Sequence, residues 1–69
     1  MDKSQISQIL AEYEQEYQRV NNEVITVKYV GGGWYRLVDK DGYDNRFNNY
    51  RLKDISEMLT VLQKRPNAT

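Results

Sequence analysis

The stretch VITVKYV–GGG–WYRLV, residues 24–38, decides the fold of this chain. Both flanks are rich in the β-branched and aromatic side chains that strands prefer. The three glycines between them exceed the two residues of the tightest hairpin turn, so the connection is flexible or bulged, or another backbone approaches it closely. The stretch predicts a β-hairpin. It does not fit a phosphate-binding loop, because a strand and not a helix follows the glycines.

Side chains alternate between the two faces of each predicted strand. The first strand carries Ile25, Val27 and Tyr29 on one face and Val24, Thr26, Lys28 and Val30 on the other. The second strand carries Tyr35 and Leu37 on one face and Trp34, Arg36 and Val38 on the other. The pairing register decides which set is buried, since a slip of one residue exchanges the two faces.

The second strand is followed by a strong turn signal, Asp39-Lys40-Asp41-Gly42. A third strand is expected from about Tyr43 to Phe47, with Asn45 on the same face as both ends, and the sequence leaves open whether it continues beyond Phe47. The pair Asn48-Asn49 then interrupts the regular pattern. These signals predict an antiparallel meander of three strands.

An amphipathic helix is predicted on each side of the strands. The first has a capping-box spacing at Asp2 and Gln5, and Asn21-Asn22 ends it. Its polar face, which includes Arg19, is expected to face solvent. The second helix begins either after a cap at Asn49 or at a capping box formed by Asp54 and Glu57, and Pro66 stops it. The apolar positions recur at helical spacing, at Ile6, Ile9, Leu10, Tyr13, Tyr17 and Val20 in the first helix and at Leu52, Ile55, Leu59 and Leu62 in the second.

The predicted fold is therefore a single small α+β domain with the order α-β-β-β-α, spanning residues 1–66. Two helices cover one face of a three-stranded antiparallel meander, and residues 67–69 form a frayed tail. The expected core consists of Ile6, Ile9, Leu10, Tyr13, Tyr17, Ile25, Val27, Leu37, Leu52, Ile55, Leu59 and Leu62.

The composition argues against catalysis. The 69 residues include no Cys and no His, which removes disulfides, thiolate metal sites and the commonest general base. The nearest carboxylates in sequence are Asp39, Asp41 and Asp44, and they lie in or beside a turn. We therefore expect no enzymatic activity, no metal, no cofactor and no small-molecule substrate.

The net charge is zero, which is unlike a protein held to nucleic acid mainly through phosphates. The charge is uneven, because residues 1–23 hold two cations and five anions whereas residues 24–69 hold eight and five. No stretch reaches the roughly 20 apolar residues of a membrane span, and no apolar leader opens the sequence. We expect a cytoplasmic protein that does not contact the membrane.

Aromatic and cationic side chains gather on the predicted sheet, and this is the candidate recognition surface. The types Trp, Tyr and Arg are enriched at the energetic centres of protein interfaces. Aromatics beside cations also bind single-stranded nucleic acids, and sheet aromatics often serve only as cross-strand packing pairs. The candidate binding residues are Lys28, Trp34, Arg36, Tyr43, Arg46 and Tyr50, with Tyr29 at the edge.

Function is expected to be recognition. The leading interpretation is a non-catalytic module that binds a protein partner or a second copy of itself as a homodimer. A chain of this size suits an accessory protein of a phage or mobile element. The alternative is a nucleic-acid-binding module that uses the same aromatic and Arg face. A third mode, capture of a basic partner by the acidic face of the first helix, depends on Glu12, Glu14, Glu16 and Glu23.

Overall fold

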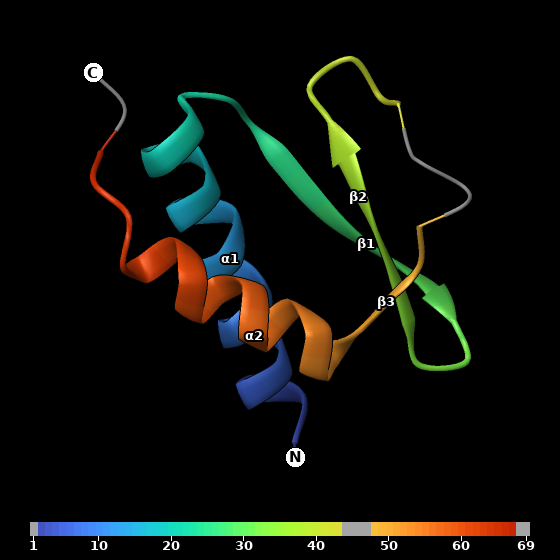
Figure 1. Ribbon diagram of the computed structural model, residues 1–69. Coiled ribbons are helices and arrows are strands. Elements are labelled where there is room, and N and C mark those ends of the chain that lie inside the picture. Colours follow the sequence, from blue (N-terminus) through green and yellow to red (C-terminus); the bar gives the residue numbers. More distant parts are fainter. Residues whose placement is uncertain (1, 44–47, 68–69) are drawn as a thin grey trace.

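The computed structural model describes residues 2–43 and 48–67. The elements are α1 (Lys3–Asn21), β1 (Ile25–Gly31), β2 (Trp34–Asp39), β3 (Tyr50–Arg51) and α2 (Leu52–Gln63). The strands form one antiparallel sheet in the order β1-β2-β3. Figure 1 shows the long hairpin of β1 and β2 beside the two helices. The predicted α-β-β-β-α order and the meander are confirmed.

The register between β1 and β2 assigns the two faces of the sheet. Val27 pairs with Leu37 and Tyr29 pairs with Tyr35, so these four side chains share a face with Ile25. Ile25 and Tyr35 are buried, whereas Thr26 and Lys28 on the other face are exposed. The helices therefore cover the face that carries the aliphatic residues, as the alternation predicts.

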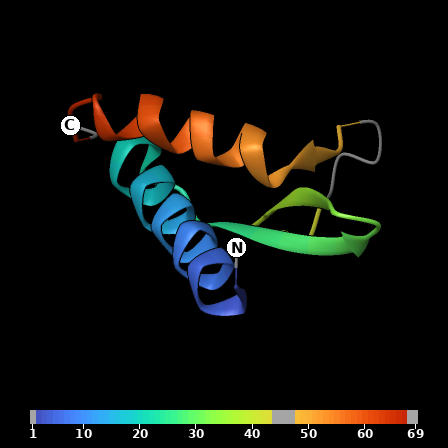
Figure 2. The same ribbon diagram turned by 90° about the horizontal axis from the view of Figure 1, so that it is seen from below.

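The core lies where the two helices meet this inner face. Figure 2 shows α2 along one side of the hairpin, with α1 meeting α2 near the start of β1. Ile55 of α2 is completely buried, and the predicted helix stripes pack around it. Tyr35 belongs to the core although the sequence analysis did not include it. The buried cluster consists of Tyr13, Ile25, Tyr35, Ile55, Leu59 and Leu62.

The glycine connection is a tight turn with a bulge. Gly32 and Gly33 have φ angles of 61° and 81°, the positive values that a type I′ hairpin turn requires. Gly31, with φ of 99°, pairs with Trp34 across a register shift that begins after Tyr29. Side chains other than glycine are strained at such angles, which explains why glycines occupy the turn.

The third strand lies beyond Phe47, in the extension that the sequence had left open. It comprises Tyr50–Arg51, and Tyr43 is not in a strand. Asp39 draws Tyr43 into the preceding turn, since its Oδ1 accepts hydrogen bonds from the backbone N–H groups of Asp41 and Tyr43, both at 2.9 Å. The rest of the predicted strand, residues 44–47, lies outside the described residues.

Capping residues mark the ends of the helices. Asp2 Oδ1 accepts from the Gln5 backbone N–H at 2.9 Å, and Asn22 ends α1 with φ of 55°, as predicted. Both expected starts of α2 are wrong. Arg51 is the N-terminal cap because it still pairs with Trp34 in the sheet, and Asp54 Oδ2 accepts from its backbone N–H at 3.1 Å.

Two polar side chains of α1 contact other elements. Glu14 Oε2 accepts from the Val27 backbone N–H at 3.2 Å and so protects part of the β1 edge. Arg19 was expected to face solvent, and this is wrong. Its guanidinium pairs with Glu16 and donates to the Leu62 carbonyl in the last turn of α2 and to the Arg65 carbonyl just beyond the helix, both at 2.9 Å. Arg19 therefore supplements the backbone hydrogen bonds at the end of α2.

The end of the chain also contacts Arg19. The guanidinium donates to Asn67 Oδ1 at 2.8 Å, although Asn67 was expected to begin a frayed tail. Residues 68 and 69 of that expected tail lie outside the described residues.

Candidate functional site

The face of the sheet that points away from the helices, called here the open face, carries three of the predicted binding residues. Lys28 and Arg36 are cross-strand partners, and Trp34 lies on the same face two residues before Arg36. Lys28 is exposed, whereas Trp34 and Arg36 are half-buried. The open face consists of Thr26, Lys28, Trp34, Arg36, Val38 and Arg51.

The other predicted binding residues do not join this surface. Tyr50 pairs with Tyr35 on the inner face and packs against the core. Tyr43 follows the turn after β2, where its side chain is 77% exposed. Arg46 lies outside the described residues. The set predicted from sequence is therefore divided between two faces and a turn.

Arg51 joins the open face, and the predicted set did not contain it. It pairs with Trp34 across β2 and β3, and its guanidinium carbon lies 4.3 Å from the centre of the Trp34 ring. A cation over an indole face is attracted by the ring quadrupole, and an Arg also stacks on it with its flat side. The signal in the sequence was the alternation Tyr50-Arg51, which is informative only once these residues are known to form a strand.

Lys28 and Arg36 place two positive charges directly opposite each other. Like charges at such positions destabilise a sheet. The Arg36 Nε donates to Asn49 Oδ1 at 2.8 Å, so a neutral amide just before β3 orients this guanidinium. The open face therefore contains three cations around one indole, with no carboxylate among its described residues.

Tyr29 contacts the turn at the tip of the hairpin. The Tyr29 hydroxyl accepts from the Gly33 backbone N–H at 3.2 Å, and its ring centre lies 5.2 Å from that of Tyr35. Tyr29 is nevertheless 59% exposed. Trp34 thus begins its strand next to a turn whose backbone is hydrogen-bonded to a side chain.

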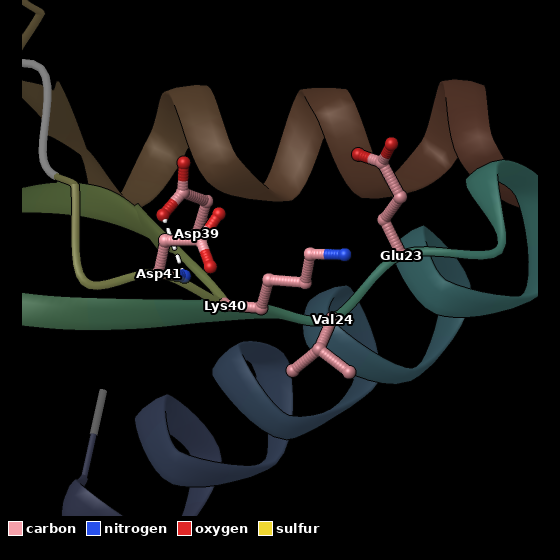
Figure 3. A pocket seen from close by; sticks show the side chains of 5 residues that line it. All are labelled: Glu23, Val24, Asp39, Lys40 and Asp41. Atoms are coloured by element: carbon pink, nitrogen blue, oxygen red, sulfur yellow. Dashed lines mark hydrogen bonds between the residues drawn. The ribbon is translucent and has the colours of Figure 1, made fainter.

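A small pocket of about 150 Å³ lies at the opposite end of the hairpin. Figure 3 shows Glu23 and Val24 on one side and the turn residues Asp39, Lys40 and Asp41 on the other. The Asp39 carboxylate organises the turn through its two backbone hydrogen bonds. The pocket is therefore a surface depression next to a turn that is held by backbone hydrogen bonds. Among the described residues, no group of three or more carboxylates is arranged to hold a metal ion.

Tyr13, whose pKa is shifted, is a residue of the core. Burial, with smaller contributions from the neighbouring Tyr17 and Tyr50, raises the pKa of Tyr13 to about 12. Tyr13 lies on the inner side of the molecule, where it packs in the buried cluster. This phenol is part of the folding energetics and has no contact with the open face in the described structure.

Comparisons with protein-family models, with curated proteins and with solved structures find no match to this chain. Within the described residues, neither helix has the length and apolar character needed to cross a membrane. The functional assignment therefore depends on the chemistry of the open face.

Proposed function

We propose that this protein is a small non-catalytic protein-binding module, and that Trp34 on the open face is the anchor of its interface. The observation that carries the proposal is the half-buried indole with the Arg51 guanidinium 4.3 Å above it and the Lys28–Arg36 pair on the same face. Trp and Arg at the centre of a patch are the residues that contribute most to protein interfaces. The proposal retains the cytoplasmic location predicted from the sequence.

The partner at the open face is a different protein. Two copies that met face to face would bring Lys28, Arg36 and Arg51 of one copy against the same cations of the other, and like charges within an interface are costly. A homodimer, if the chain forms one, would have to use another surface. This argument separates self-association from the recognition function.

Nucleic acid remains the second candidate because the same cations could meet phosphates. A chain with no net charge has little long-range attraction for a polyanion. A base-stacking platform also needs a bare ring, and the Arg51 guanidinium lies over one side of Trp34. We therefore favour a protein partner.

Site-specific photo-cross-linking in cells of the source organism tests the proposal. A cross-linking amino acid replaces Lys28 on the open face, and a matched variant carries it at Gln15, which is exposed on α1. We expect one discrete protein adduct from position 28 that resists nuclease treatment and is absent from position 15. Trp34→Ala in the same background should weaken binding about 30-fold or more, the equivalent of roughly 2 kcal/mol.

Equal adducts from both positions would contradict the proposal, and a nuclease-sensitive adduct would favour nucleic acid. Circular dichroism of the Trp34→Ala variant is the control for folding. A variant that unfolds would show that Trp34 is structural, in which case Trp34→Phe, which keeps an aromatic ring, measures the interface contribution.

A further inference from the structure

We infer that this protein forms a weak dimer with a second copy of itself through the outer side of α2. The surface concerned is called here the α2 stripe, and it consists of Asp54, Glu57, Met58, Val61, Lys64 and Arg65. These residues recur every three or four positions, so they lie on one side of the helix. Figure 2 shows α2 along the outside of the molecule, with α1 and the hairpin on its other side. The stripe is therefore separate from the open face.

The centre of the α2 stripe is apolar and accessible. Val61 is 51% exposed, and Met58, one turn before it, is half-buried. An open groove of about 300 Å³ runs beside them, between α2 and α1, and its other lining residues are Tyr13, Tyr17, Asn21, Leu62 and Arg65. Most of these side chains are apolar or aromatic. An apolar residue of a partner that covers Val61 and enters the groove removes this surface from water, which is the main source of free energy in association.

The two ends of the α2 stripe carry opposite charges. Asp54 and Glu57 precede the apolar centre, and Lys64 and Arg65 follow it. The backbone N–H of Arg65 donates to the Leu62 carbonyl at 3.0 Å, so the helical turn continues to the last of these charges. Among the described residues, neither Lys64 nor Arg65 forms an ion pair within its own chain. The α1 wall of the groove adds no charged side chain, so α2 alone sets this pattern.

This pattern is complementary to itself in one orientation. Glu57 and Arg65 each lie four residues from Val61, on opposite sides of it. When two α2 helices pack antiparallel about a two-fold axis at Val61, the Glu57 of each copy comes opposite the Arg65 of the other. A parallel pair would instead set like charges against each other, which is costly. The order of the charges therefore specifies a second copy of the chain, packed antiparallel, as the partner of the stripe.

The dimer should be weak, because each copy contributes only one side of a helix and the neighbouring groove. Small interfaces of this kind are typical of transient complexes. Glu57 and Arg65 are exposed, so their ion pairs lie at the rim of the contact, where they select the orientation and contribute little affinity. The affinity depends mainly on Val61, Met58 and the groove.

Sedimentation equilibrium of the purified protein provides the test. The protein is measured from about 10 µM to about 1 mM, the range in which weak complexes dissociate, and we expect a reversible monomer–dimer equilibrium. Val61→Lys should raise the dissociation constant at least about tenfold, since it sets two like charges at the two-fold axis in place of an apolar contact. Val24→Lys is the matched control, because Val24 is equally exposed but lies between α1 and β1. It should change the dissociation constant less than about twofold.

Exchanging the charges tests the antiparallel orientation. Glu57→Lys and Arg65→Glu should each weaken the dimer about three- to tenfold, because each sets like charges opposite each other at two contacts. The double variant Glu57→Lys/Arg65→Glu should return the dissociation constant to within about threefold of the wild type. The two positions are about 12 Å apart along one helix, so a contact between the copies, and not one within a chain, would explain the recovery.

Circular dichroism checks that each variant folds, as expected for substitutions at exposed positions. If Val61→Lys fails to fold, the charge exchange decides the question. A wild-type protein that stays monomeric, a dimer that Val61→Lys leaves unchanged, or a double variant as weak as the single variants would each overturn the inference. Cross-linking from position 28 measures the proposed function separately, because Lys28 lies on the open face.

Discussion

The two faces of the sheet differ in which side chains they carry and in how deeply those side chains are buried. On the inner face Ile25 and Tyr35 are buried against the helices, and the chemistry is that of packing. On the open face the same strands present Lys28 opposite Arg36, a pairing that costs stability. The difference teaches that the inner face is optimised for folding of this small domain. The open face carries cations around one indole instead of a packed apolar cluster, and we expect it to contribute less to folding.

The largest expected effect is on the inner face, at Ile55. Ile55→Ala should lower the free energy of unfolding by about 2–5 kcal/mol, because the residue is fully buried and the helices cannot close the cavity completely. Urea denaturation followed by circular dichroism measures the change. Since a core of this size supplies only about 3–5 kcal/mol, the variant is expected to be largely unfolded. A loss below about 1 kcal/mol would mean that the inner face does not hold the fold together.

The next effect is a pH dependence of stability that arises in the core. The pKa of Tyr13 is about 12 in the folded protein, against an ordinary value of 10.0 in the unfolded chain. The folded state therefore holds this proton more tightly. The contribution of the protonated Tyr13 phenol to the free energy of unfolding is fully present below pH 10. It is lost as the pH rises toward 12, and the loss is at most about 2–3 kcal/mol.

Urea titrations between pH 9 and pH 12 measure this loss, and Tyr13→Phe is the matched control because it removes the titrating hydroxyl. The variant should lose less stability over this range than the wild type. The same decline in both proteins would show that the alkaline sensitivity arises elsewhere.

The open face should contribute little to folding. Arg51→Gln removes the guanidinium from above Trp34 and should lower the free energy of unfolding by less than about 1 kcal/mol, the usual contribution of an exposed cation–π contact. Thermal unfolding checks this value. A loss comparable to that of Ile55→Ala would remove the distinction between the two faces.

The smallest effect should have the opposite sign. Lys28→Glu replaces a repulsive cross-strand pair with an attractive one, so we expect an increase in stability of about 0.2–1 kcal/mol. The gain should shrink at high salt, which screens exposed charges. Denaturation at two ionic strengths measures both quantities. A destabilised variant would show that the Lys28–Arg36 pair is not repulsive and would weaken the case that this face is adapted to a partner.

Much of the fold was predictable because its signals are local. The helical stripes, the Asp2 cap, the Asn22 end of α1 and the glycine turn each depend on neighbouring residues, and all of them are present. The candidate site was predicted in part. Lys28, Trp34 and Arg36 share the open face, as alternation implies. Tyr50 was assigned to the binding surface and not to the core, because the sequence left open how far the third strand extends beyond Phe47.

The sequence by itself determined the order of the elements and the two faces of the hairpin, since periodicity and turn chemistry act between residues close in the chain. Only the tertiary structure decided that Tyr50–Arg51 is the third strand, with Tyr50 turned toward the core and Arg51 over Trp34. It also decided that Arg19 holds the end of α2 across more than 40 residues of chain. Such contacts depend on which segments lie side by side after folding, and no local pattern of side chains encodes that choice.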